Sequence, residues 1–423
     1  MRPGIPASLE PSLSIEDQVL LCVAHPCFSH ERRGRLTHLL ASPLDWRELL
    51  EQADRHRMVP FLYHHLQGGP HKGAPASALA ALAHRSREHL IWNVLLNREL
   101  IRLLGEFNRG GIPVMPLKGP LLADLLYGDF SLRPMGDIDL LIRREDLAKG
   151  EQILLRAGCI RWPAAEEGAD YHNSYATEGE RGARIVVDLH WDLADSHVTR
   201  LDVREIWASA SRIAWEGREV WTMTLPDLLL YLCLHAVKDG LGSLRPLLDI
   251  ALVVERFGGI LPWKELVEKA RAARIGTPVY ASLLQSQVFL GAQVPLEVFS
   301  ALRPSRRIGW LLAQAMFRWR GGTLHTSPDL LVGPIMAVLH LLWEDSLRGK
   351  LRHLRRHLFP SARLRARWTS FPPCTSILRW YPIRLWQACG HLTRQLAARS
   401  RSGQGGPRQG RPSCTSGPTV GTH

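Results

Sequence analysis

The sequence lacks any apolar stretch long enough to cross a membrane. Its longest hydrophobic runs, at 225–234 and 330–342, are interrupted by proline, aspartate, glycine or histidine, whereas a membrane-spanning helix needs roughly 18 uninterrupted apolar residues. The first residues carry charges with no sustained apolar region behind them, so the N-terminus does not resemble a secretory signal. We therefore expect no transmembrane segment.

Cysteine pairs of the CxxC type are also absent. The seven cysteines are scattered and odd in number, which argues against a disulfide framework and against a zinc site. Cys22 and Cys27 lie near His25 and His30, but their spacing matches no standard metal motif, and buried thiols explain them more simply. This cysteine usage is typical of a reducing cytoplasm, and a cytoplasmic protein is expected.

Acidic residues are missing from the C-terminal segment. Positions 346–423 hold 15 Lys or Arg and no Asp or Glu, which leaves 38 basic against 40 acidic residues in the remainder of this chain of net charge +13. The basic segment could contact an anionic membrane surface or nucleic acid weakly, or it could be a helical end of the fold with a solvated tail. Residues 1–345 are therefore nearly neutral.

What the sequence does contain is enough apolar material for large cores. With 423 residues, 45% of them hydrophobic, two or three domains are expected. Periodicity divides the chain into a helical region at 1–109, a strand-and-helix region at 110–225, a helical region at 226–399 and a Gly/Ser/Pro/Arg-rich tail at 400–423 that should be disordered. The fold class is therefore α+β.

Individual elements follow from the same periodicity and from end signals. Helices are predicted at 14–25, 45–66, 77–108, 120–127, 145–157, 226–237, 246–257, 262–272 and 278–290, and further helices to about 356. Buried strands are predicted at 112–117, 136–142, 184–190 and 219–224.

Three acidic residues on two of these strands carry the chemistry. Asp137 and Asp139 are two apart on one predicted strand, so both side chains leave the same face. At about 7 Å they repel by about 2 kcal/mol in an effective dielectric of about 20, and a divalent metal would compensate them. Asp188 on a second apolar strand could add a third ligand. Mg²⁺, with Mn²⁺ as the alternative, suits such carboxylates together with nucleotide phosphates.

A phosphate-binding turn is predicted just before these strands. Lys118 and Gly119 stand where a strand passes into a helix, and backbone N–H groups at a helix N-terminus attract phosphate. Gly119 would let the backbone approach closely, and Lys118 could add a point charge.

The ordered set of motifs resembles a known family. The runs LRPMGDIDLL at 132–141 and VVDLHWDL at 186–193, with the preceding LKGP, are similar to the uncharacterised nucleotidyltransferase family of bacteria, a branch of the DNA polymerase beta-like superfamily. The likeness covers roughly 40–385, including the LFPS run at 358–361.

The resemblance implies a small mixed β-sheet core flanked by mainly helical N- and C-terminal regions. It implies that Asp137, Asp139 and Asp188 bind metal and catalyse transfer of a nucleoside monophosphate from an NTP, with release of pyrophosphate. It also places Gly136 and Arg133 in the nucleotide-binding block. The acceptor implied is an unidentified sugar, peptide or small metabolite.

One position departs from the superfamily pattern. Most members have Gly-Ser at the phosphate turn, whereas Pro120 follows Gly119 here. The serine contact to phosphate is therefore missing, and Lys118 is a hypothetical substitute. This departure keeps open the alternative of a catalytically silent nucleotide-binding module. A second alternative, which the basic C-terminal segment raises, is an adaptor that recruits a biosynthetic complex through residues 346–423.

Several other residues have two interpretations each. Arg133 either contacts a phosphate or pairs with Asp137 or Asp139. His190, on the same strand face as Asp188, either donates a hydrogen bond that orients a metal-binding carboxylate or acts as an acid or base. Trp191 either packs or stacks on a base. Four residues in the helical region after the sheet could form a rim over the nucleotide, or they could be ordinary core or surface residues: His235, Lys238, Arg245 and Asp249.

Overall fold

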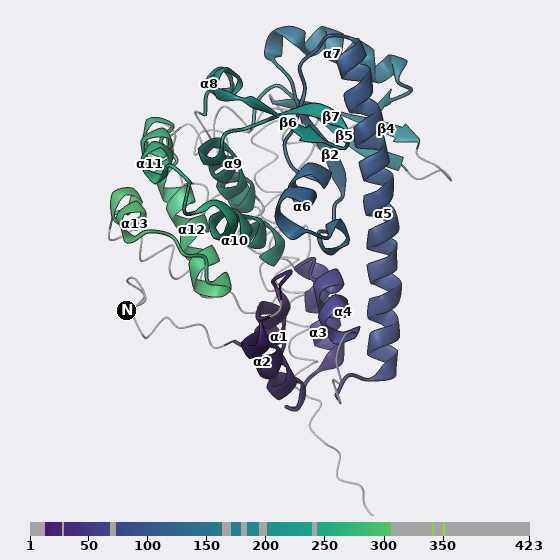
Figure 1. The fold of residues 1–423 in the computed structure, drawn as a ribbon, viewed down its shortest axis with the longest axis vertical. Helices are drawn as coiled ribbons and strands as arrows, with labels where there is room; N and C mark the ends of the chain where they lie inside the picture. Colours follow the sequence, from purple (N-terminus) through teal and green to yellow (C-terminus); the bar gives the residue numbers. More distant parts are fainter. Residues whose placement is uncertain are drawn as a thin grey trace, which may run out of the picture.

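The computed structural model describes residues 13–27, 29–67, 73–162, 171–178, 184–193, 201–238, 243–305, 341, 350 and 351. Within these ranges the chain forms thirteen α-helices and a small mixed sheet (Figure 1). The predicted α+β class is confirmed. The basic segment and tail that the sequence singled out at 346–423 lie almost wholly outside the described residues.

Four short helices form the N-terminal end of the molecule: α1 Ile15–Val23, α2 His30–Leu40, α3 Trp46–Arg55 and α4 Val59–Gln67. A capping box starts α1, because the Ser14 hydroxyl accepts from the Asp17 N–H and the Asp17 carboxylate accepts from the Ser14 N–H. The single helix predicted at 45–66 is wrong in one respect: Arg57 has a φ of 56° and divides it into α3 and α4.

The long helix α5 (Ala76–Arg109) connects this end to the sheet. Figure 1 shows it running along one side of the molecule from α3 and α4 up to β4. Its first half contributes Leu82 to the core of the N-terminal and C-terminal helices, whereas its second half contributes Leu96 to Phe107 to the core under the sheet. One helix thus supports both hydrophobic cores.

The central sheet has five strands in the order β1-β2-β5-β4-β3. The strands are β1 Met115–Pro116, β2 Asp137–Leu141, β3 Ile160–Arg161, β4 His172–Glu178 and β5 Arg184–His190. Only β2 and β5 are parallel; β1 pairs antiparallel with β2, β4 with β5, and β3 with β4. The last of these strands in the chain therefore occupies the centre of the sheet.

Two strands of the sheet were not predicted, and one prediction belongs elsewhere. No strand was expected at β3 or β4. The strand predicted at 219–224 exists as β7 (Arg218–Thr222), but it pairs with β6 (Ser211–Trp215) in a separate hairpin. Glu216 and Gly217, at φ 48° and 69°, form the tight turn that matches the twist of such a hairpin.

Helices cover the sheet and build the C-terminal half. The sheet region contains α6 Pro120–Tyr127, the 3₁₀ turns η2 Phe130–Leu132 and η3 Arg144–Asp146, α7 Leu147–Arg156 and α8 Val203–Ser209. The C-terminal helices are α9 Leu225–Lys238, α10 Leu244–Phe257, α11 Trp263–Ala272, α12 Gly276–Leu290 and α13 Leu296–Leu302. The predicted helices in this half are confirmed up to 290, and α10 packs against α6, α9 and α12.

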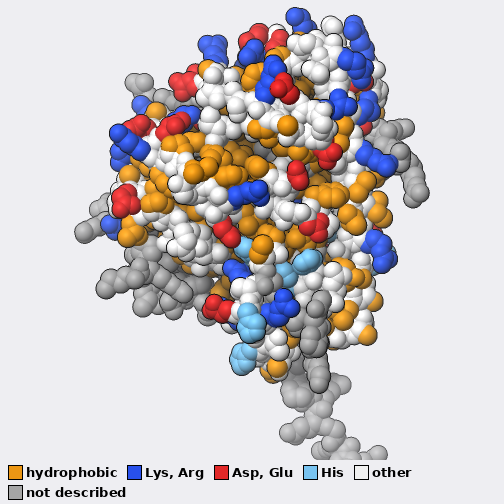
Figure 2. Space-filling view, in the orientation of Figure 1, with side chains coloured by type: hydrophobic (Ala, Val, Ile, Leu, Met, Phe, Trp, Pro, Cys, Tyr) orange, Lys and Arg blue, Asp and Glu red, His pale blue; other side chains and the backbone are white. Residues whose placement is uncertain are grey.

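No described helix is long and apolar enough to span a membrane. The described cysteines are free thiols: Cys22, Cys27, Cys159 and Cys233. On the face in Figure 2, basic and acidic side chains are interspersed around the sheet end, and hydrophobic side chains gather around α9.

Candidate functional site

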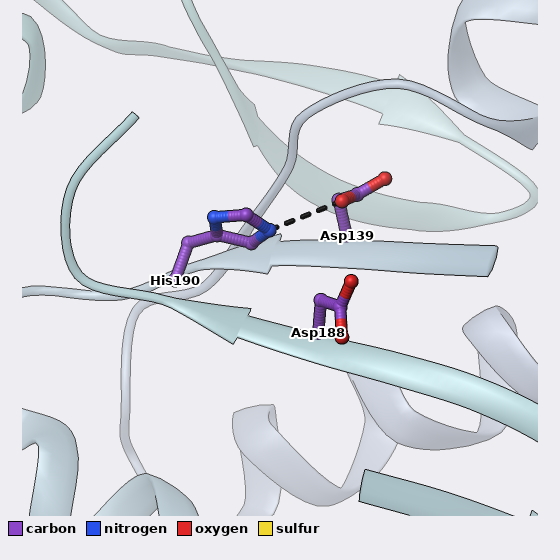
Figure 3. Close-up of side chains that lie close together, drawn as sticks. All are labelled: Asp139, Asp188 and His190. Carbon is purple, nitrogen blue, oxygen red and sulfur yellow. Dashed lines mark hydrogen bonds and ion pairs between the residues drawn. The ribbon is translucent and has the colours of Figure 1, made fainter. Parts of the chain in front are cut away.

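Three polar side chains from the two parallel strands meet on one face of the sheet. Strands β2 and β5 are in register so that Asp139 lies opposite Asp188 and Leu141 lies opposite His190. Because side chains alternate between faces, Asp139, Asp188 and His190 share a face. Their ligand atoms all lie within 4.8 Å of one another (Figure 3). This is the spacing that a single metal ion needs.

Each carboxylate of this group is oriented by a hydrogen-bond donor. The His190 Nε2 lies 3.0 Å from the Asp139 Oδ1, and because a carboxylate only accepts, the Nε2 carries the proton. The Ser174 hydroxyl, on β4, donates to the Asp188 Oδ1 at 2.5 Å. Asp139 and His190 are buried and Asp188 is half-buried, so these bonds hold the acids in defined positions.

Lys118 supplies the positive charge beside the acids. Strand β1 runs antiparallel to β2, and the Leu117 N–H donates to the Asp139 carbonyl at 3.1 Å, which brings the next residue alongside the two acids. The Lys118 ammonium lies 3.0 Å from the Asp139 Oδ2 and 3.6 Å from the Asp137 Oδ1. The expectation that Asp137 and Asp139 share a face agrees with this common contact.

His235 on α9 holds the ammonium group from the opposite side. The distance between the Lys118 Nζ and the His235 Nε2 is 2.9 Å. An ammonium group only donates, so the Nε2 of His235 accepts and the imidazole is neutral. Burial, together with the charge of Lys118, lowers the pKa of His235 well below its ordinary value. The C-terminal helices thus reach the sheet acids through this pair.

The two facing acids have opposite pKa shifts. Burial alone would raise the pKa of Asp139, but the Lys118 charge and the His190 hydrogen bond outweigh it and hold that pKa well below the ordinary range. Burial raises the pKa of Asp188, the Asp139 charge acts in the same direction, and the Ser174 bond opposes both. Lys118 therefore compensates Asp139 but not Asp188.

The donor set fits an oxygen-preferring divalent cation. Asp139 and Asp188 offer carboxylate oxygens on one face, and burial, together with the charge of Asp139, raises the pKa of Asp188. While the His190 Nε2 donates to Asp139, that nitrogen orients a ligand and is not itself one. Carboxylates with open positions for water and phosphate suit Mg²⁺ or Mn²⁺. Asp137 stands beside this group, with 39% of its side chain exposed.

The predicted phosphate turn has the expected backbone. Gly119 precedes α6 with φ 78° and ψ −137°, a conformation that glycine adopts and other residues avoid, and Pro120 occupies the first helical position. No side chain caps this end of α6 among the described residues. Gly136 lies exposed immediately before β2; nothing in its surroundings distinguishes it.

Arg133 does not lie where the sequence placed it. Its guanidinium is 2% exposed and donates to both carboxylate oxygens of Asp249 on α10, at 2.9 and 2.8 Å. The ion pair that was one expectation for Arg133, with Asp137 or Asp139, is formed instead with Asp249, which lies 116 positions further along the chain. Enclosed in this pair, Arg133 is a structural link between η2 and α10.

Several residues at the site were not singled out by the sequence. Ser174 and His172 are on the unpredicted strand β4, and the His172 ring stacks on His190 with centroids 5.0 Å apart. Tyr171 packs on His172 and accepts from the Lys238 Nζ at 3.0 Å. The run HNSYATE is mostly polar and lacks apolar alternation, so a search for apolar strands passes over it.

The comparisons with known proteins identify a family. The family model described as uncharacterised nucleotidyltransferase matches residues 42–291, which is more than half of the chain. The match begins where the resemblance was expected to begin but ends before the run at 358–361, which also lies outside the described residues. Neither the curated proteins nor the solved structures include a match to this chain.

Proposed function

This chain belongs to the uncharacterised nucleotidyltransferase family, and on that premise we propose that it is a metal-dependent nucleotidyltransferase. It would move a nucleoside monophosphate from an NTP to a hydroxyl-bearing acceptor, a sugar, peptide or metabolite, and release pyrophosphate. The observation that carries the proposal is the parallel register that puts Asp139 opposite Asp188 with His190 beside them.

Asp137, Asp139 and Asp188 are the residues that would hold Mg²⁺, or Mn²⁺ in its place. The bound ion would neutralise charge on the phosphates and lower the pKa of the attacking hydroxyl. His190 and Ser174 orient Asp139 and Asp188 through the hydrogen bonds described above. The protein's contribution is thus a pair of fixed carboxylates, prepared before the substrate arrives.

The transfer step itself is a substitution at phosphorus. The acceptor oxygen forms a bond to the α-phosphorus, the bond from that phosphorus to the bridging oxygen breaks, and pyrophosphate leaves with the electron pair. Asp188, whose Oδ1 accepts from Ser174, offers its Oδ2 to take the hydroxyl proton. Lys118 offers a cation at the turn where the superfamily serine is missing.

The test is pyrophosphate release from each of the four NTPs, with Mg²⁺ or EDTA and a pool of hydroxyl acceptors. Asp139→Asn should abolish metal-dependent release while leaving thermal unfolding cooperative. Asp124→Asn, an equal change at an exposed acid on α6, should behave as wild type. Retained turnover in Asp139→Asn would sink the proposal.

A catalytically silent nucleotide-binding module is the second candidate. Two observations favour it: Pro120 follows Gly119 where the superfamily has serine, and Lys118 already neutralises Asp137 and Asp139. Such a module would bind NTP with metal but release no pyrophosphate with any acceptor. The adaptor alternative depends on residues 346–423, which lie almost entirely outside the described part of the chain.

A further inference from the structure

A buried cluster between α6, η2 and α10 has more positive than negative charge. Asp249 accepts from the Arg133 guanidinium through two bonds and from the Tyr127 hydroxyl at 2.6 Å. A second guanidinium, that of Arg245, lies one helical turn before Asp249 on α10. Two arginines therefore share one carboxylate, and Arg133 already uses both of its oxygens.

Arg245 is incompletely paired. Its Nη1 is 3.6 Å from the Asp249 Oδ2, beyond the length of a good hydrogen bond. Its Nε is buried and has no acceptor within the described part of the chain. Burial, with the Arg133 charge acting in the same direction, lowers the pKa of Arg245. A buried guanidinium with an unused donor is costly unless an anion completes it.

This cation belongs to the same neighbourhood as the candidate site. Asp249, which Arg245 approaches from one turn away, accepts from the Tyr127 hydroxyl of α6. Helix α10 packs on α6, which begins at the phosphate turn, and on α9, which carries His235. The helix that carries Arg245 thus packs against the two helices that border the phosphate turn and the Lys118–His235 pair.

We propose that Arg245 binds the terminal phosphates of the donor nucleotide and so replaces the serine that the Gly119–Pro120 turn lacks. The inference rests on the proposed function, and it names the residue that recognises the triphosphate. An arginine suits the role because its planar fork can donate two parallel hydrogen bonds to phosphate oxygens. Arg133 would remain bonded to Asp249 and neutralise it while the Arg245 side chain contacts the phosphates.

The experiment measures binding of inorganic tripolyphosphate, ATP and AMP by calorimetry in the presence of Mg²⁺. Arg245→Gln should weaken tripolyphosphate and ATP binding about tenfold to hundredfold, the loss expected for a charge-assisted hydrogen bond, and should leave AMP binding nearly unchanged. Arg245→Lys should recover part of the loss, because it restores the charge without the fork. Arg256→Gln, at an exposed position of the same helix, is the matched control.

The outcomes separate this inference from the function on which it rests. If Arg245 serves only as a counter-ion to Asp249, Arg245→Gln lowers the thermal midpoint and binds tripolyphosphate as wild type does, and the inference is overturned. It is overturned as well if the wild type binds no tripolyphosphate. If Arg245-dependent binding is found but no NTP yields pyrophosphate, the inference stands and the transferase proposal fails.

Discussion

The ammonium group of Lys118 lies 2.9 Å from the Nε2 of His235, although 117 positions separate the two residues in the chain. The same ammonium contacts Asp139 at 3.0 Å. A single side chain therefore links the sheet that carries the acids to the helix α9 that faces them. The charge at the site therefore depends both on the acids of the sheet and on His235 of α9.

Removal of the Lys118 charge should change how the protein responds to metal. In Lys118→Met, Asp137 and Asp139 lose their shared counter-charge, and breaking such a largely buried pair should lower the free energy of unfolding by about 3 kcal/mol. Mg²⁺ or Mn²⁺ should then raise the thermal midpoint more in the variant than in wild type, because no ammonium competes with the ion. Lys264→Met, at an exposed lysine on α11, is the control. Equal metal-induced shifts in wild type and Lys118→Met would contradict this.

The hydrogen bond from Ser174 should matter for activity more than for stability. Ser174→Ala leaves Asp188 without its orienting donor, and loss of a partner that orients a metal ligand commonly costs about tenfold to hundredfold in metal affinity or turnover. Titration of Mg²⁺ against pyrophosphate release measures the effect. Ser300→Ala, on the exposed part of α13, should leave the Mg²⁺ dependence of pyrophosphate release unchanged. The same unchanged Mg²⁺ dependence in Ser174→Ala would show that its hydrogen bond does not orient a metal ligand.

The buried pair of Arg133 and Asp249 should be a main contributor to stability. Asp249→Asn leaves the Arg133 guanidinium uncompensated at 2% exposure, which should cost about 3–5 kcal/mol in urea unfolding. Burial opposes ionisation of Asp249, but Arg133 outweighs it and lowers the pKa of that carboxyl. The contribution is thus present above the ordinary carboxyl pKa of about 3.9 and is lost as the pH falls toward the lowered value. A variant as stable as wild type would refute the assignment.

Acidification should destabilise the N-terminal helices through His65. Burial lowers the pKa of His65 to about 4, whereas an unfolded histidine titrates at about 6.5. Between these values the unfolded chain binds the proton first, so the free energy of unfolding should fall by up to about 3 kcal/mol as the pH drops through this window. His65→Gln should flatten that dependence in urea titrations at several pH values. His64→Gln, at the half-buried neighbour, is the comparison, and an unchanged slope in His65→Gln would count against the prediction.

Gly119 should resist replacement for a conformational reason. A Cβ there would meet only the Met135 Sδ at 4.0 Å, so space is available, but the φ of 78° is strained for any other residue. Gly119→Ala should cost about 1–3 kcal/mol and weaken NTP binding, because Lys118 adjoins the turn. Gly128→Ala, at the other end of α6 with φ 69°, should lose stability without losing NTP affinity. Equal NTP affinities in Gly119→Ala and Gly128→Ala would show that the Gly119 turn does not bind the phosphates.

Local signals predicted some elements to the residue. Helix α6 at 120–127 was predicted because proline marks its first position, and Gly128 ends it in the left-handed conformation. Strand β5 at 184–190 was predicted because its buried positions are apolar. In both cases the residues that determine the element lie within it or next to it, so the local sequence is enough to predict it.

The remaining errors concern interactions between distant residues. Strand β4 was missed because His172 and Ser174 turn a polar face to the site, and the apolar alternation that marks a half-buried strand is therefore absent. Arg133 was paired with the acids next to it because the sequence does not show that Asp249 would be buried against it. His235 was only one of four candidates, since nothing local to α9 indicates that it meets Lys118.

The strand order has a consequence for how the protein is assembled. The strands β1 and β2 lie at one edge of the sheet and β3 and β4 at the other, and β5, the last of the five in the chain, lies between β2 and β4. Asp139 and Asp188 lie opposite each other where β5 pairs with β2. A nascent chain therefore has no complete acid cluster until β5 has docked. An ion bound by both Asp139 and Asp188 would stabilise the pairing of β5 with β2. Metal availability during synthesis should therefore influence the yield of folded protein.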